Sequence, residues 1–135
     1  MFGSSKKRKI SRIDTLVGQH TVIQGDVRFS GGLHIDGTIK GNVTAENDGV
    51  SMLSVSDNGT IEGEVNVPHI ILNGVVIGDV HASKHVELSS KARINGNVHY
   101  NLIEMAIGAE VNGKLVHAME PMDTPLSLGN DEPVE

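Results

Sequence analysis

The sequence contains no cysteine and no tryptophan, and it has only one tyrosine and two phenylalanines. The lack of cysteine excludes disulfide bonds and thiolate chemistry. Because large aromatic side chains are so few, a core must be built from Ile, Val and Leu, which suit a narrow interior of stacked layers. No apolar run approaches the roughly 20 residues of a membrane span, and no signal-peptide apolar region follows the basic start. We therefore expect a single cytoplasmic domain.

The net charge of −6 is unevenly distributed along the chain. Residues 1–13 carry a charge of +5, residues 14–118 carry −6, and residues 119–135 carry −5. The last segment also holds three of the four prolines. We expect a disordered basic arm at 1–13, a folded domain at 14–118 and a disordered acidic tail at 119–135.

What the sequence does contain is a five-residue motif, apolar-any-Gly-any-apolar, that recurs six times. Its central glycines are Gly25, Gly41, Gly63, Gly78, Gly96 and Gly113. They are spaced by 16, 22, 15, 18 and 17 residues. A period in this range indicates a solenoid, in which each repeat forms one turn of a coil and cannot bury its apolar face alone.

The segments between these glycines have the pattern of short β-strands. Apolar and polar residues alternate, as at Leu33 and Ile35 or at Ile70 and Leu72, and this period of two places the apolar side chains on one face. No stretch shows a sustained helical period, so we predict no helix. Asn and Asp beside the glycines favour tight corners there, while a close approach of two backbones is the alternative. The interval of 22 predicts a bulging loop at 45–49.

These repeats resemble those of the bactofilins, a family of polymer-forming bacterial cytoskeletal proteins. The resemblance covers about residues 14–118 and is carried by the segments 21–27, 33–43, 61–65 and 92–98. It implies a single-stranded right-handed parallel β-helix, or β-solenoid, of about six turns with flexible tails. The spacing alone suits a left-handed coil of three six-residue sides as well. The resemblance also implies end-to-end self-assembly without a nucleotide, and a scaffold for cell-shape, cell-wall or polarity proteins at the inner face of the membrane.

The two ends of such a coil are the candidate sites. An uncovered end exposes unpaired backbone groups and an apolar cross-section, and the sequence shows no evident cap. We predict a polymer interface at the N-terminal end, formed by Val22, Ile23, Val27 and Phe29. We predict a second interface at the C-terminal end, formed by Ile107, Val111, Leu115 and Val116. Like ends would meet about two-fold axes, which gives a homopolymer without polarity.

The basic arm is a candidate membrane contact. It joins an apolar residue, Phe2, to the basic residues Lys6, Lys7, Arg8 and Lys9. Anionic lipid attracts each basic residue by about 1 kcal/mol, and full burial of the phenylalanine would add roughly 1.5–3 kcal/mol. The alternatives are a solubilising tail and a nucleic-acid-binding arm. An acidic core and the lack of interleaved aromatic residues disfavour nucleic acid as a partner.

Other chemistry is weakly represented. Neither phosphate-binding glycine motif is present, so we expect no nucleotide and no other cofactor. The chain has seven histidines, but His81 and His85, four residues apart, would form a metal site only on a helix. Six acidic residues lie on different turns and could align along a groove: Glu62, Glu64, Asp79, Glu87, Glu104 and Glu110. We expect no metal site and no catalytic site.

The alternative functions are a β-helix enzyme, either an acyltransferase or a polysaccharide-active protein, and a monomeric binding module with capped ends. The uneven intervals disfavour the acyltransferases, whose repeats are strictly six residues long.

Overall fold

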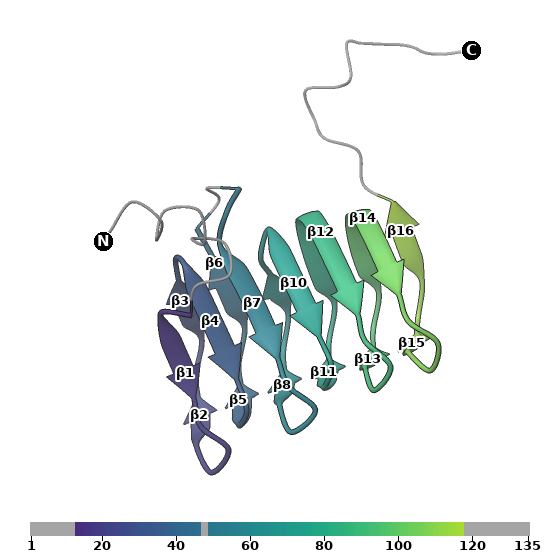
Figure 1. The fold of residues 1–135 in the computed structure, drawn as a ribbon. Helices are drawn as coiled ribbons and strands as arrows, with labels where there is room; N and C mark the ends of the chain where they lie inside the picture. The colour runs from purple at the N-terminus through teal and green to yellow at the C-terminus, as the bar shows by residue number, and fades with distance from the viewer. Residues whose placement is uncertain (1–12, 47–48, 118–135) are drawn as a thin grey trace, which may run out of the picture.

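The computed structural model describes residues 13–46 and 49–117. Every regular element in this part of the chain is a β-strand. The strands stack as a coil of six turns, as Figure 1 shows. The prediction of an all-β solenoid without a helix is therefore confirmed.

The strands form three columns, and each turn contributes one strand to each column. The first column contains β1 (Thr15–Val17), β4 (Gly32–Ile35), β7 (Met52–Val55), β10 (His69–Leu72) and the second halves of β12 (Val80–Leu88) and β14 (Val98–Met105). The second contains β2 (Val22–Gln24), β5 (Thr38–Lys40), β8 (Thr60–Glu62), β11 (Val75–Ile77), β13 (Arg93–Asn95) and β15 (Glu110–Asn112). The third contains β3 (Val27–Phe29), β6 (Val43–Ala45), β9 (Val65–Asn66), the first halves of β12 and β14, and β16 (Leu115–His117). All of these pairings are parallel.

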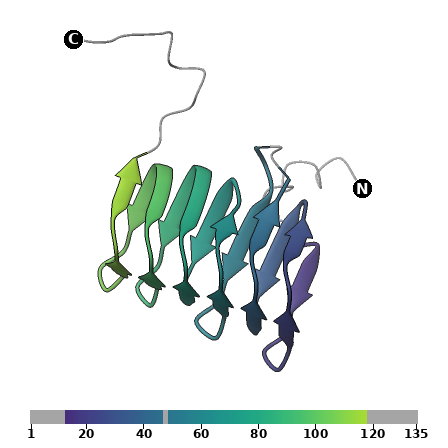
Figure 2. The same cartoon turned by 180° about the vertical axis from the view of Figure 1, so that it is seen from behind.

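The coil is right-handed. In Figure 1 the strands of the first column run downward on the near side, those of the third column run upward behind them, and the chain advances from β1 towards β16. The view from behind in Figure 2 gives the same sense of rotation. This is the handedness that the family resemblance implies.

The core consists of ladders of aliphatic side chains that run along the coil. In-register pairing places the apolar residues of the second column directly above one another: Ile23, Ile39, Ile61, Val76, Ile94 and Val111. The four members in the inner turns are at most 2% exposed. Full burial of each such side chain contributes roughly 1.5–3 kcal/mol. Flat layers of Val, Ile and Leu therefore supply the core that the scarcity of aromatic residues predicts.

The glycines of the repeat lie at the corners between the second and third columns. Gly78 has a φ of +145°, and a Cβ added there would lie 2.3 Å from the carbonyl oxygen of Gly63 in the turn below. At the same corner the Gly78 N–H donates to the carbonyl oxygen of Asn95 at 2.9 Å. Both expectations for the glycines therefore hold here, because the corner needs a left-handed conformation and the two backbones approach closely.

The residues that follow four of the motif glycines link neighbouring turns through their side chains. The Oδ1 atom of Asp26 accepts a hydrogen bond from the N–H of Asn42, whose own Oδ1 accepts one from the N–H of Glu64, both at 2.9 Å. The same bonds join Asp79 to Asn97 at 2.9 Å and Asn97 to Lys114 at 3.0 Å. These short side chains thus tie the corners of successive turns together as well as suiting a tight bend.

Loop lengths account for the uneven glycine intervals. Two residues connect β3 to β4 and two connect β4 to β5, within the 16-residue interval from Gly25 to Gly41. In the 22-residue interval, six residues connect β6 to β7 and four connect β7 to β8. The insertion therefore follows β6, as the prediction of a bulge at 45–49 requires. However, Ala45 itself belongs to β6, and residues 47 and 48 lie outside the described part.

Candidate polymerisation surfaces at the two ends of the coil

The coil presents edge strands at both ends. Within the described residues, β1, β2 and β3 are each paired on one side only, and so are β15, β16 and the second half of β14. Edge strands present unpaired N–H and C=O groups that can pair with another chain. Each end also carries an outermost layer of core side chains, most of which are partly exposed, so both ends offer main-chain pairing and apolar contact together.

At the N-terminal end, the predicted residues divide between the core layer and the flank. Ile23, Val27 and Phe29 are partly buried and pack against the core cluster. Val22 is in register with Thr38 and is 55% exposed, so it lies on the outer flank of the first turn. The inward layer also includes Val17, which is 5% exposed.

At the C-terminal end, the predicted residues divide in the same way. Val111 is partly buried against the core. Leu115 continues the ladder of Val98 and is 44% exposed. Val116 is in register with His99 on the outer flank and is 37% exposed. Ile107 lies in the connection between β14 and β15 and is 98% exposed.

Sequence reasoning did not include three residues of these end layers. They are Val17 in the first turn and Ile103 and Met105 in the last turn, which stand in register with the core residues of the first column. Met105 is 45% exposed. Aligning the repeats position by position would have found all three, because each occupies the same step of the alternation as a buried Leu, Ile or Val one turn away.

One arginine holds the loop that carries Ile107. The guanidinium of Arg93 donates hydrogen bonds to the carbonyl oxygens of Ala92 at 2.8 Å and Gly108 at 2.9 Å. It also lies 3.5 Å from a carboxylate oxygen of Glu110. Arg93 thereby fastens the last loop of the coil to the turn beneath it.

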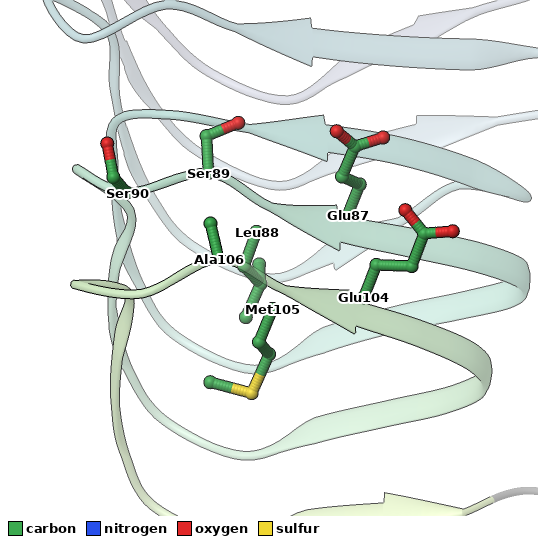
Figure 3. Close-up of a pocket in the computed structure, with 7 residues that line it drawn as sticks. All are labelled: Glu87, Leu88, Ser89, Ser90, Glu104, Met105 and Ala106. Carbon is green, nitrogen blue, oxygen red and sulfur yellow. The ribbon is translucent and has the colours of Figure 1, made fainter.

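The candidate carboxylates do not gather into one groove. Glu87 and Glu104 are in register on neighbouring strands, and Figure 3 shows both side chains on the same side of the sheet. They border a shallow groove of about 290 Å³ with Ser89, Ser90 and Met105. Glu62 and Glu110 lie on the second column, whereas Glu64 and Asp79 lie at the glycine corner. Within residues 13–46 and 49–117, no group of three or more His, Asp or Glu side chains is placed to hold a metal ion.

One carboxylate near the first turns has a perturbed pKa. A hydrogen bond with Ser56 and the neighbouring His34 hold the pKa of Asp36 below its ordinary value of 3.8. The Nε2 atom of His34 lies 3.1 Å from Oδ1 of Asp36, and its Nδ1 atom lies 3.0 Å from Oγ of Ser54. This cluster bridges the second and third turns on the outer surface and does not line either end.

The predicted membrane contacts Phe2, Lys6, Lys7, Arg8 and Lys9 lie outside the described residues. In the part that is described, no helix is long and apolar enough to cross a membrane.

Comparison with known proteins places this coil in a family. The family model described as "Bactofilin: Polymer-forming cytoskeletal" matches residues 15–116. Bactofilin BacO of Myxococcus xanthus (strain DK1622) is 28% identical over 110 residues, which cover 82% of this chain and 84% of the relative. Bactofilin BacP of the same organism is 28% identical over 106 residues, which cover 78% of this chain but only 42% of that relative. No solved structure gave a significant match. With six turns of parallel β-coil and a family match from the first strand to the last, this chain belongs to the bactofilins, which are polymer-forming structural proteins of the cytoskeleton and not enzymes.

Proposed function

We propose that this bactofilin assembles without nucleotide, through the two ends of its coil, into filaments without polarity. The observation that carries the proposal is the open last turn, where Met105 and Leu115 continue core ladders and are 45% and 44% exposed. A second coil stacked on this turn would bury both side chains as the next layer of the core. It would also give partners to the backbone groups of β15 and β16.

The energetic requirement for such a junction is modest. Association of two chains costs an estimated 4–15 kcal/mol in lost freedom of motion, and each half-exposed aliphatic residue recovers about 1 kcal/mol on burial. The end layer supplies several such residues, and the edge strands supply main-chain hydrogen bonds. A single junction is thus expected to be of moderate strength, while a filament gains from having a junction at each end of every subunit.

The like-to-like arrangement is supported by the resemblance to the family and makes a distinct prediction. If last turns meet last turns and first turns meet first turns, a variant blocked at one end still forms dimers through the other. If last turns instead meet first turns, blocking either end leaves monomers only. The size of the particles formed by single-end variants therefore distinguishes the two arrangements.

The test is negative-stain electron microscopy and analytical ultracentrifugation of the full chain without nucleotide. The wild type should form filaments, and Leu115→Arg should form dimers that keep their β-type circular dichroism. Phe29→Arg tests the other end in the same way. Ile77→Arg is the matched control, because Ile77 is 46% exposed on the outer face of β11 in the middle of the coil. Long filaments of Leu115→Arg, or loss of filaments in Ile77→Arg, would contradict the proposed surfaces.

We further propose that the filament lies at the inner face of the cytoplasmic membrane and serves as a scaffold for cell-shape or envelope proteins. The support is the basic arm with Phe2 at its tip, because many weak anchors along one polymer act together. Deleting residues 2–9 should release the protein from liposomes that contain anionic lipid while filaments still form. Equal sedimentation of the truncated and full chains with these liposomes would exclude the arm as the anchor.

A further inference from the structure

The most distinctive group outside the two ends is a pair of stacked histidines. His81 on β12 and His99 on β14 are in register in the third column. Their ring centroids lie 4.4 Å apart and the ring planes are inclined by only 7°. Both side chains are partly buried on the outer face of the coil. The pair thus joins the fourth turn to the fifth by direct contact of two titratable rings.

Along its own ladder, the pair has no charged neighbour in the adjacent turns. Along the same ladder the next residues are Asn66 on one side and Val116 on the other. The ionisable groups of the surrounding elements lie further along the strands or around the next corner: Glu64, His69, Asp79, Lys84, His85, Glu87, Glu104, Lys114 and His117. Among these, Asp79 accepts a hydrogen bond from the N–H of Asn97, His85 lies 3.6 Å from Glu104, and His117 packs against Tyr100. Among residues 13–46 and 49–117, no ion pair includes His81 or His99.

This geometry favours protonation of one ring of the pair but disfavours protonation of both. A single imidazolium over a neutral ring is favourable, since a cation is attracted to the face of an aromatic ring. A second proton places two like charges face to face at 4.4 Å, and like charges at that distance disfavour each other's charged form. In the unfolded chain the two rings take up protons independently, at an ordinary pKa near 6.5.

We propose that the His81–His99 pair is a proton-sensitive joint between the fourth and fifth turns, closed near neutral pH and loosened when both rings are protonated. The direction in which stability changes with pH follows from proton linkage. At acid pH the unfolded chain binds more protons than the folded coil, so stability rises with pH and falls on acidification. If the unfolded chain binds one proton more than the folded coil, the unfolding equilibrium constant changes by up to about tenfold per pH unit. The pair would therefore weaken the C-terminal half of the coil, and the junction that it carries, in acid.

His34 shows the opposite arrangement within the same protein. Its ring lies 3.1 Å from the carboxylate of Asp36, so protonation of His34 creates an attractive pair. Acid sensitivity is therefore expected from the stacked pair specifically and not from histidine content in general. The inference does not depend on filament assembly, because it concerns contacts within one chain.

The direct test is nitrogen-15 solid-state NMR of the full chain, labelled at the histidine rings, between pH 5 and pH 8. This measurement counts protonated rings in filaments and in single chains alike. In the wild type, His81 and His99 should together take up protons in two separated steps. In His99→Gln, the signal of His81 should titrate in one step, at a pH above the second step of the wild type. An unchanged titration of His81 in that variant would overturn the proposal.

The second measurement is stability against denaturant at pH 8, 6.5 and 5.5. The loss of stability on acidification should be smaller in His99→Gln than in the wild type, by up to about tenfold in the unfolding constant per pH unit. His20→Gln is the matched control, because His20 is an exposed histidine in the connection between β1 and β2. Equal pH slopes for the wild type and His99→Gln would also overturn the proposal. Should His99→Gln fail to fold, His81→Gln serves in its place, with the one-step titration then expected of the His99 signal and the same reduced pH slope of stability.

Discussion

The two ends of the coil are built from the same repeat, yet they expose different amounts of the core. In one ladder of the first column, Val17 at the first turn is 5% exposed and Met105 at the last turn is 45% exposed. In one ladder of the third column, Val27 is partly buried and packed on the core, whereas Leu115 is 44% exposed. Equivalent positions in the sequence are therefore not equivalent surfaces. The C-terminal end has more apolar area left for a partner to cover.

The largest expected loss of stability comes from substituting a corner glycine in the middle of the coil, in contrast to the corner glycine of the first turn. A Cβ at Gly78 would lie 2.3 Å from a backbone oxygen, whereas a Cβ at Gly25 meets nothing within 4 Å. Gly78→Ala should destabilise the fold by about 4 kcal/mol or more, because the clash with rigid backbone adds to the strain of an unfavourable φ. Gly25→Ala should be destabilised only by the strained φ, which should cost about 1–3 kcal/mol in the free energy of unfolding. Denaturant unfolding at one protein concentration measures both.

Gly25→Ala also tests the N-terminal junction. Along the corner, the Cβ of each glycine would point towards the preceding turn, as the close approach of Gly41 to Gly25 shows. For Gly25 that direction leads out of the first turn, where a partner would stack. We expect weakened N-terminal association from a chain that remains folded. Unaltered filaments of Gly25→Ala would mean that no partner backbone lies above this corner.

The next effect compares the two ends directly. Met105→Arg and Leu115→Arg should each weaken C-terminal association by about 2–4 kcal/mol, as replacement of a central interface residue does. Phe29→Arg should weaken N-terminal association by less, since the first layer has less apolar surface to lose. Dissociation constants from sedimentation equilibrium give this ranking. A larger loss for Phe29→Arg would reverse the order of the two ends.

A smaller effect is expected from the loop that carries Ile107. Arg93→Gln removes the bond to the carbonyl oxygen of Gly108 and the contact with Glu110, which is partly exposed to solvent. We expect a loss of about 1 kcal/mol in stability and a similar weakening of C-terminal association, with N-terminal association unchanged. Hydrogen exchange at residues 106–109 would report the loosened loop. Protection equal to that of the wild type would show that Arg93 does not hold it.

The sequence predicted the interior of this fold better than its ends. Alternation and glycine spacing identified the strands, the number of turns and the position of the insertion, because each interior position is constrained by turns on both sides. At the ends that constraint is present on one side only. Val22 and Val116 look like core residues by type, but their register places them on the flank. Met105 follows the inward alternation, yet no glycine motif adjoins it to draw attention to the position. The register of the histidine pair could have been predicted, because His81 and His99 each lie three residues after a motif glycine, Gly78 and Gly96, but the stacked orientation of their rings could not.

The smallest expected effect contrasts the acid response of the N-terminal half with that of the C-terminal half. The hydrogen bond with Ser56 and the nearby His34 lower the pKa of Asp36 in the folded state. A lowered folded pKa means that Asp36 contributes stability above the pKa of the unfolded chain, and that this contribution is lost as pH falls through the folded value. Asp36→Asn should therefore be slightly less stable than the wild type at pH 7, and the difference should shrink below about pH 4. The stacked pair at His81 and His99 consists of imidazoles, which as a class take up protons at a milder pH than carboxylates do. Curves of stability against pH for Asp36→Asn and His99→Gln should therefore differ from the wild-type curve in separate pH ranges. If Asp36→Asn differed from the wild type only between pH 5 and pH 7, His34 and not the carboxylate would govern this cluster.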